Sequence, residues 1–459
     1  MEPDEFIGRA EEMAVLESQY EGVKHPLVQI VGRRRVGKSE LICRFVEGRN
    51  ALYYEADREQ APSLLRSFSE AVCRYTGEEC TYADWGQAVR GFVTRGPPGR
   101  KVLAIDEFQY IAMSDPDFVK AFQSIWDTYL SKQDVMVIVC GSYISMMSRI
   151  FSEYRSPLYG RSTSVLVIAP IAFRDTVRGR DYRRAVEEYA LTGGVPYYMA
   201  LMSDGSTVLE NIERAVMGVG APLVNEPKFL LSDELRDPTS YMTYLKVLAQ
   251  GNRKMDAITS AVQAKSSDVA PYLRTLADMG LIERRVPVTE PAPERNRSGQ
   301  YVITDCFIRF WFRFVYPYLG DITRRRSAAA LREVADHFVD SHVAFVFEDI
   351  CREELYRHLE SAGVAATVGS YWDRSVEIDV VALDRAGATV YAGECKYWER
   401  PVGADVLRSL VEKCGRVARF EGYRVVPCLF SASGYTDAAV SEAAEAGAIL
   451  FDCGEPLKN

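Results

Sequence analysis

The segment from residue 27 to residue 48, LVQIVGRRRVGKSELICRFVEG, constrains the fold more than any other part of the chain. A short apolar run comes first, a glycine-containing loop follows, and the remaining residues have the apolar spacing of a helix. The loop matches G-x-x-x-x-G-K-[ST] at every fixed position, and its backbone amides can cradle phosphates at the helix N-terminus. The residues predicted to form this nucleotide-binding loop are Gly32, Arg33, Arg34, Arg35, Val36, Gly37, Lys38 and Ser39.

A second segment, KVLAIDEFQYI at residues 101–111, supplies the acids that such a loop needs. Its apolar part predicts a buried strand that ends in Asp106 and Glu107. Lys38 is expected to neutralise phosphate oxygens, and Ser39 with Asp106 to hold Mg²⁺ beside ATP. Glu107 is expected to orient or activate the attacking water. The acid pair therefore predicts hydrolysis of ATP as well as binding.

A third apolar run, VMVIVCGS at residues 135–142, ends in Ser142. A polar side chain at this place can sense the γ-phosphate of the nucleotide. A residue that only begins a turn after the strand is an equally good interpretation.

Composition limits the class of protein. The chain has 459 residues, which favours about three domains, and a net charge of −9, which argues against a surface coated by nucleic acid. No signal peptide or membrane-spanning run is recognisable. The 10 cysteines form no C-x-x-C pair, and the 4 histidines have no zinc-site spacing. We therefore expect neither a disulfide framework nor a structural zinc, and a cytoplasmic location.

Taken together, the motifs of the first half resemble the archaeal-type ATPases, P-loop proteins of the AAA+/STAND group. The resemblance covers about residues 5–235 and rests on FIGRAEEMAVLE, the phosphate loop, AIDEFQYI, CGS, SPLYGR and LTGGVPYY, in that order. It implies that residues 6–9 border the adenine pocket and that Arg161 contacts the γ-phosphate. It also implies that Gly193, Gly194 and Pro196 couple the nucleotide to a helical lid. Read alone, Arg161 fits a surface arginine equally well.

The middle of the chain, residues 239–304, has the pattern of three helices followed by a β-hairpin. This order predicts a winged helix, with a recognition helix near residues 267–279 and a charged loop as the wing. Such a domain binds DNA or packs against another protein. The arginines expected to cluster at the wing are Arg284, Arg285, Arg295 and Arg297.

The last part changes to a helix at residues 342–361 and two strands at residues 375–384 and 387–399. Side chains two apart on a strand share a face, so Glu394 and Lys396 point together. Asp379 on the neighbouring strand can join them.

The predicted metal ligands of this tail are Glu348, Asp379 and Glu394, which are hard oxygen donors suited to Mg²⁺ or Mn²⁺. Lys396 is expected to position or help deprotonate a water that attacks a phosphodiester. In the alternative interpretation, Glu394 and Lys396 simply neutralise each other on a half-exposed strand.

The spacing of these residues resembles the PD-(D/E)xK nuclease superfamily, and more closely the nuclease-like domain of unknown function fused to archaeal-type ATPases. By this resemblance Glu348 is the helix acid, Asp379 the motif acid, and Glu394 with Lys396 the E-x-K pair. The chain departs from the family where residues 377–379, Glu-Ile-Asp, replace the literal Pro-Asp.

The sequence thus predicts an α/β protein with a P-loop NTPase parallel sheet and a helical lid, then a winged helix and a small restriction-endonuclease-like α/β domain. We expect an ATP-controlled DNA-processing enzyme without a membrane segment, able to form a homo-oligomer. A nucleotide-switched signalling or scaffold protein with an inactive tail, and an ATP-dependent transcription regulator, are the alternatives. The expected domain ranges are 1–170, 171–236, 237–305, 306–341 and 342–459.

Overall fold

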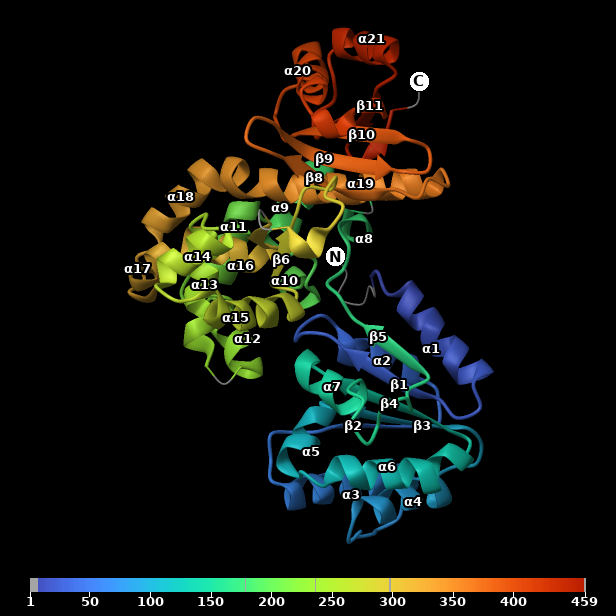
Figure 1. Ribbon diagram of the computed structural model, residues 1–459. Helices are drawn as coiled ribbons and strands as arrows, with labels where there is room; N and C mark the ends of the chain where they lie inside the picture. Colours follow the sequence, from blue (N-terminus) through green and yellow to red (C-terminus); the bar gives the residue numbers. More distant parts are fainter. Residues whose placement is uncertain (1–6, 178, 236, 297–298, 458–459) are drawn as a thin grey trace. The chain divides into compact units, whose positions relative to one another are not determined.

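The computed structural model describes residues 7–177, 179–235, 237–296 and 299–457 (Figure 1). The chain divides into two compact units, each of which is described by itself. The first comprises Glu2–Ala172 with Val195–Ala200, and the second comprises Phe173–Gly194 with Leu201–Asn459.

A parallel sheet of five strands, in the order β2-β3-β4-β1-β5, forms the centre of the first unit. Three of these strands are buried along their whole length, because the sheet is covered on both faces. The predicted parallel α/β sheet is therefore confirmed. Its strands are β1 (Leu27–Val31), β2 (Ala51–Glu55), β3 (Lys101–Asp106), β4 (Val135–Gly141) and β5 (Ser164–Val167).

Apolar helix faces pack against this sheet and complete two separate clusters of buried side chains. The helices of this unit are α1 (Ala10–Gly22), α2 (Lys38–Val46), α3 (Ala61–Thr76), α4 (Trp85–Arg95), α5 (Phe108–Ser114), α6 (Phe118–Thr128), α7 (Ile144–Phe151) and α10 (Pro196–Met199).

A disulfide bond joins Cys73 at the end of α3 to Cys80 in the loop before α4. The sequence predicts no disulfide framework and did not single out this pair, whose two Cα atoms lie 5.9 Å apart after the turn that ends α3.

The second unit begins with short helices and continues with α13 to α15 and an antiparallel pair of strands, β6 and β7. This is the order of three helices and a hairpin that the sequence predicts. The elements are α8 (Phe173–Val177), α9 (Tyr182–Thr192), α11 (Val208–Ile212), α12 (Glu226–Glu234), α13 (Pro238–Ala249), α14 (Met255–Val262), α15 (Ser266–Asp278), β6 (Ile282–Arg285), β7 (Gln300–Ile303), α16 (Cys306–Phe310), α17 (Leu319–Thr323) and α18 (Ala328–Phe338).

The tail of the second unit is a mixed sheet of six strands in the order β13-β12-β11-β10-β9-β8. β8, β9 and β10 are antiparallel neighbours, whereas β10, β11 and β12 run parallel. Its elements are α19 (Ala344–Ser361), β8 (Thr367–Trp372), β9 (Glu377–Asp384), β10 (Thr389–Lys396), α20 (Ala404–Gly415), β11 (Arg424–Ser431), α21 (Asp437–Ala446), β12 (Ile449–Asp452) and β13 (Glu455–Pro456). Within the described ranges, no helix combines the length and the apolar character needed to cross a membrane.

Candidate functional site

The predicted phosphate loop joins the end of β1 to the start of α2. Gly37 has a φ of 88°, a left-handed conformation that only glycine adopts without strain. A Cβ atom on Gly32 would lie 2.4 Å from the backbone oxygen of Ile168, so the loop has no room for a side chain there. Lys38 Nζ donates to the backbone oxygen of Arg33 at 3.0 Å. The loop therefore holds its lysine over its own backbone, at the N-terminus of a helix.

Asp106 lies at the carboxyl end of β3 and is almost completely buried. Its Oδ2 accepts hydrogen bonds from Ser39 Oγ at 2.6 Å and from the hydroxyl of Tyr53 at 2.9 Å. Burial and the nearby Asp106 carboxylate raise the pKa of Tyr53, which keeps this phenol a hydrogen-bond donor. Ser39 and Asp106 thus present two hard oxygens side by side, a donor set that fits Mg²⁺. The sequence reasoning missed Tyr53.

Glu107 follows directly and is held by two side chains, Ser142 after β4 and Gln109 of α5. Ser142 Oγ donates to Glu107 Oε2 at 2.8 Å, and Gln109 Nε2 also donates to this oxygen. Gln109 is fully buried and was not singled out by the sequence. Ser142 therefore positions Glu107, while its role as a γ-phosphate sensor stays a prediction.

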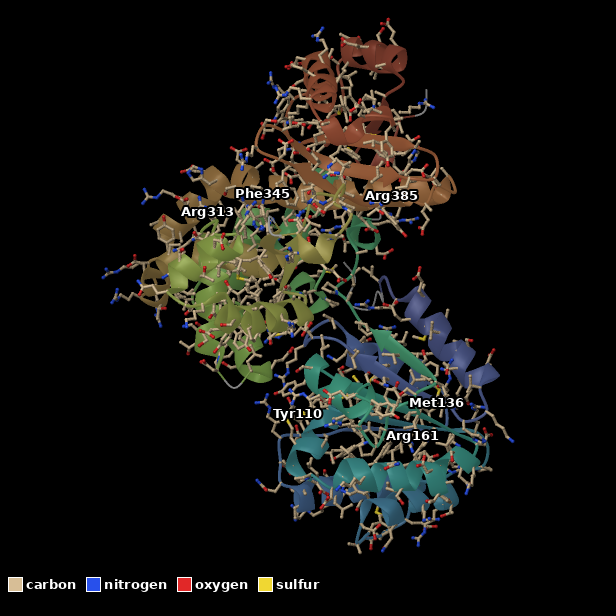
Figure 2. All side chains as sticks on the ribbon, in the orientation of Figure 1. Tyr110, Met136, Arg161, Arg313, Phe345 and Arg385 are labelled. Atoms are coloured by element: carbon tan, nitrogen blue, oxygen red, sulfur yellow. A yellow bond between two sulfur atoms is a disulfide. The ribbon has the colours of Figure 1, made fainter. Side chains whose placement is uncertain are left out.

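Arg161 does not lie beside the phosphate loop. The chain after it pairs with the start of β1, since the amide of Thr163 donates to the backbone oxygen of Leu27 at 2.8 Å. The phosphate loop follows the opposite, carboxyl end of β1. Arg161, labelled in Figure 2, instead makes two hydrogen bonds of 2.8 Å to the carboxylate of Asp127. The expectation that Arg161 contacts a γ-phosphate on its own chain is therefore wrong, and a contact with a neighbouring chain's nucleotide stays a prediction.

The segment expected to border the adenine pocket is described only from residue 7, so Phe6 lies outside the described residues. Arg9 Nη2 donates to the backbone oxygen of Val36 at 2.9 Å and to that of Ala169 at 2.6 Å. The guanidinium is nearly buried, at 5% exposure. Arg9 therefore ties the phosphate loop to the chain that follows β5.

Residues 195–200 contact the phosphate loop within the first unit. The Arg35 guanidinium lies 4.3 Å from the ring centroid of Tyr197, and a Cβ atom on Gly37 would lie 3.6 Å from Pro196. Residues 193–194, both glycine, precede this segment with φ angles of 57° and 70°. This is the place where the sequence expects the nucleotide to be linked to the helices that follow.

In the tail, β9 and β10 bring Asp379 and the Glu394–Lys396 pair to the same end of the sheet. The backbone amide of Cys395 donates to Asp379 Oδ2 at 2.9 Å, and Lys396 Nζ donates to Glu394 Oε1 at 2.9 Å. A second lysine, Lys413 of α20, contacts Glu394 at 2.8 and 3.1 Å. The sequence reasoning missed Lys413.

The third predicted acid, Glu348, comes from α19 and not from the sheet. Lys413 of α20 contacts Glu394, whereas burial and the nearby Cys351 of α19 raise the pKa of the Cys395 thiol. Adjacent residues of a strand point to opposite faces, so α19 and α20 cover opposite faces of β10, as Figure 1 shows. Glu348 belongs to α19. Among the described residues, no group of three or more His, Cys, Asp or Glu side chains is placed to hold a metal ion. The metal-binding role of Glu348, Asp379 and Glu394 therefore stays a prediction.

Electrostatics in the tail nevertheless link these acids. Burial and then the nearby Asp379 raise the pKa of Glu348 to about 8. Burial and then Glu394 raise the pKa of Asp379 to about 6. Although burial opposes it, the hydrogen bond to Glu394 raises the pKa of Lys396. Lys396 is therefore protonated beside Glu394, and its role toward a water or a phosphate stays a prediction.

Arg352 of α19 connects the tail acids to the hairpin. Its Nη1 donates to the backbone oxygen of Asp379 at 2.8 Å, and its Nη2 donates to Asp349. Asp349 also accepts from Arg285 Nη2 of β6 at 2.7 Å. One partly exposed ion-paired group thus joins β6, α19 and β9.

Two of the four arginines expected to cluster at the wing bind protein groups, and the other two have side chains outside the described residues. Arg284 donates to the backbone oxygens of Pro293, at 2.9 Å, and Asn296. Arg285 is bound to Asp349. Arg297 and the side chain of Arg295 lie outside the described residues. Arg284 and Arg285 of the expected cluster therefore direct donors at protein acceptors.

Two regions of the chain match known protein families. Residues 6–202 match a family described as an ATPase domain predominantly from Archaea, and residues 311–407 match one described as archaeal and bacterial proteins of unknown function. The uncharacterized protein MJECL04 of Methanocaldococcus jannaschii is 31% identical over 388 residues, which cover 83% of this chain and 84% of that protein.

Two solved structures are more distantly similar. The Walker-type ATPase PABY2304 of Pyrococcus abyssi has 20% identity and a TM-score of 0.49, covering 66% of this chain and 95% of that one. The Aeropyrum pernix Orc1 protein in complex with DNA has 16% identity and a TM-score of 0.32, covering 69% and 95%. At these scores the two structures add nothing to the sequence matches.

Proposed function

The chain belongs to the family of its Methanocaldococcus relative, with an archaeal ATPase domain in front and a domain of unknown function behind, and from this premise we propose a nucleotide-controlled enzyme that acts on nucleic acid. The family match supports ATP binding and hydrolysis in the first unit. The observation that carries the rest is the arrangement of Asp379, Glu394 and Lys396 at one end of the tail sheet.

The proposed ATP site uses the parts that the first unit presents at one edge of its sheet. Lys38 and the start of α2 bind the phosphates. The lysine supplies a positive charge, and the helix N-terminus supplies backbone amides and the positive end of its dipole. Ser39 and Asp106 would hold Mg²⁺, which supplies charge neutralisation at the phosphates. Glu107, held by Ser142 at 2.8 Å, orients the attacking water.

The proposed tail is a PD-(D/E)xK nuclease-like domain, preceded by a winged helix at residues 237–305. In support, a carboxylate on β9 and an E-x-K pair on β10 share one end of the sheet. Asp379 and Glu394 would hold Mg²⁺ or Mn²⁺, which supplies Lewis acidity at a phosphodiester. Lys396, kept protonated by Glu394, positions the phosphate.

Helix α9 is the proposed link between the two sites. The hydroxyl of Tyr397 lies 3.0 Å from the backbone oxygen of Arg183 and 3.2 Å from Glu187 Oε1. Arg183 Nη1 donates to Ser433 Oγ at 2.8 Å, and its guanidinium lies 4.4 Å from the Tyr397 ring centroid. Tyr397, the residue after Lys396, is therefore bound to α9. The carboxyl end of α9 continues through residues 193–194 to residues 195–200, the segment that contacts the phosphate loop.

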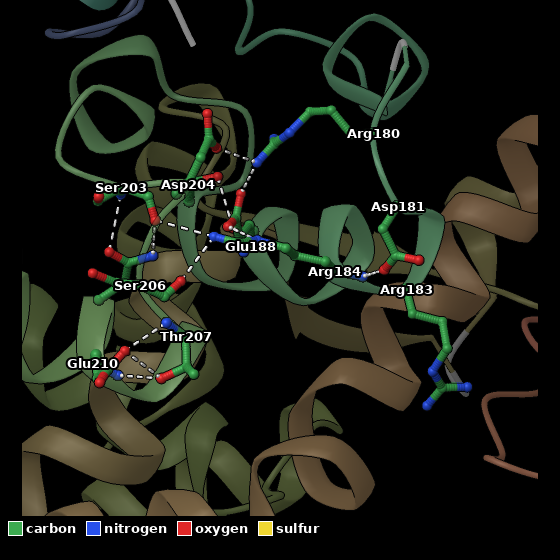
Figure 3. Close-up of polar contacts among 12 residues, drawn as sticks. Arg180, Asp181, Arg183, Arg184, Glu188, Ser203, Asp204, Ser206, Thr207 and Glu210 are labelled. Atoms are coloured by element: carbon green, nitrogen blue, oxygen red, sulfur yellow. Dashed lines mark hydrogen bonds and ion pairs between the residues drawn. The ribbon is translucent and has the colours of Figure 1, made fainter.

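The opposite side of α9 is fastened as well, which makes the helix a stiff element (Figure 3). Arg184 Nε donates to Glu188 Oε1 at 2.9 Å, and its Nη2 donates to the backbone oxygens of Ser203 and Ser206 at 3.0 and 2.8 Å. Asp181 caps the helix by accepting from the Arg184 amide at 2.8 Å. In Figure 3, Arg183 points away from this network. If α9 moves, we therefore expect it to move as a rigid helix and to displace Tyr397 with it.

A second candidate function is a nucleotide-switched signalling or scaffold protein with an inactive tail. One observation favours it: both oxygens of Glu394 are bound to lysines, so this acid is already neutralised. The transcription-regulator alternative loses its support at the wing, because Arg284 and Arg285 bind protein groups.

The test is cleavage of single-stranded and double-stranded DNA and RNA by the full chain, with Mg²⁺ or Mn²⁺, with and without ATP. We expect metal-dependent cleavage that responds to ATP and is lost in Asp379→Ala and Lys396→Ala. ATP hydrolysis without cleavage of any nucleic acid supports the scaffold function instead. Cleavage that persists in Lys396→Ala rules out the proposed site.

A further inference from the structure

Glu394 is bound by two ammonium groups that come from different elements. Lys396 of the same strand contacts only Oε1, at 2.9 Å. Lys413, in the last turn of α20, contacts Oε2 at 2.8 Å and Oε1 at 3.1 Å. The Glu394 side chain is 11% exposed and that of Lys413 is 30% exposed. Both oxygens of a nearly buried carboxylate thus face ammonium groups.

A divalent cation would compete for these same oxygens. Mg²⁺ and Mn²⁺ prefer carboxylate oxygens as ligands. A metal ion bound to Glu394 would therefore need the same oxygen lone pairs that now accept hydrogen bonds from the two lysines. Two positive charges close to one carboxylate also repel a third.

We propose that Lys413 is a resident counter-cation of the tail site, which holds Glu394 in place and is displaced when a divalent metal ion binds. The inference rests on the metal-binding role of the tail proposed above and adds how entry of the metal is controlled.

Lys413, and not Lys396, is the group that moves. Lys396 Nζ lies 5.6 Å from the ring centroid of Trp398, two residues further along the chain, which gives it a second partner beside Glu394. Lys413 reaches Glu394 from a helix through a flexible four-carbon stem and is partly open to solvent. Rotation of that stem releases both of its contacts without disturbing β10. The strand then keeps Glu394 and Lys396 in their places.

The experiment measures Mn²⁺ binding to the nucleotide-free full chain by loss of the free Mn²⁺ electron-spin signal. The Asp106→Asn change is present throughout, so that the first unit does not contribute a metal site. Lys413→Met removes the charge and keeps the length, whereas Lys413→Arg keeps the charge. Arg408→Met is the matched control, because Arg408 lies on the same helix and pairs with Glu442 at 3.5 Å.

We expect Lys413→Met to bind Mn²⁺ about tenfold more tightly than the parent, because a like charge is removed from beside the metal position. Lys413→Arg and Arg408→Met should bind as the parent does. Thermal unfolding shows whether each variant is folded. Adding Asp379→Ala to Lys413→Met should abolish the tight site.

Unchanged or weaker binding by a folded Lys413→Met variant overturns the inference, and weaker binding makes Lys413 a supporting partner of the metal ligands instead. In either case the parent's own Mn²⁺ binding still upholds the proposed tail site. If neither the parent nor Lys413→Met binds Mn²⁺, the proposed metal site fails together with this inference.

Discussion

The hydroxyl of Tyr397 lies 3.0 Å from the backbone oxygen of Arg183, which fastens the residue after Lys396 to the first turn of α9. This hydrogen bond spans 214 positions of sequence and joins the tail sheet to the helix that leads toward the phosphate loop. Because the ring is also buried against Phe347, the contact combines packing with a directed polar bond.

Replacing Tyr397 by Phe should remove the polar bond and keep the packing. We expect the free energy of unfolding to fall by about 1 kcal/mol, the usual net value of one hydrogen bond. We also expect any response of the tail to ATP to weaken while ATP hydrolysis itself continues. Denaturant unfolding and paired activity assays measure both. Tyr356→Phe on exposed α19 surface is the control, and an equal loss in that variant would contradict the assignment.

Glu107→Gln should separate binding of ATP from its hydrolysis. The amide can still accept a hydrogen bond from Ser142, but it carries no negative charge to orient or activate water. We expect ATP affinity to stay within a few-fold of the parent and turnover to fall by about 100-fold or more. Equilibrium nucleotide binding and steady-state phosphate release measure the two quantities. Turnover close to that of the parent would exclude Glu107 from the reaction.

Arg161→Ala tests whether a neighbouring chain takes part in hydrolysis. Arg161 lies at the amino edge of the sheet, paired with Asp127, so it should not affect an isolated chain's own nucleotide. We expect the variant to match the parent at dilutions where the chain is monomeric. A loss of turnover that appears only as protein concentration rises would show that Arg161 acts on the neighbour. A loss at every concentration, in a folded variant, would contradict the placement described above.

The phosphate loop could be predicted in detail because its motif is local. The strand, the loop and the helix that form it are continuous in sequence, so the spacing alone sets the positions of Gly37, Lys38 and Ser39. Asp106 was predictable for a related reason, since a buried parallel strand that ends in acids places them at the same edge as the loop. Tyr53 was not, because its contact with Asp106 depends on β2 lying next to β3.

The tail shows the limit of strand periodicity. Alternation correctly placed Glu394 and Lys396 on one face of β10, but it could not say which helix covers that face. The structure places α20 there, which brings in Lys413, and places α19 with Glu348 on the other face. Only the three-dimensional order of helices around the sheet determines this, and a single sequence carries no direct signal for it.

His342 should make stability depend on pH. The ring is fully buried, its Nε2–H donates to the backbone oxygen of Ala190 at 2.7 Å, and burial lowers its pKa to about 3. The folded chain therefore keeps this imidazole neutral, whereas in the unfolded chain it takes up a proton below its ordinary pKa of about 6.5. Below that pH the unfolded state binds the additional proton, so the free energy of unfolding falls as pH decreases, down to about pH 3.

The expected slope from this residue is about 1.4 kcal/mol per pH unit between pH 6 and pH 3, added to the effects of the acids. His342→Gln cannot titrate in either state, so its unfolding free energy should lose this part of the slope. His337→Gln, at an exposed position of α18, should keep it. Urea unfolding at a series of pH values from 7 to 4 measures the difference between the variants. Parallel curves for the parent and His342→Gln would mean that His342 becomes protonated without unfolding, and that the buried ring does not oppose the charge.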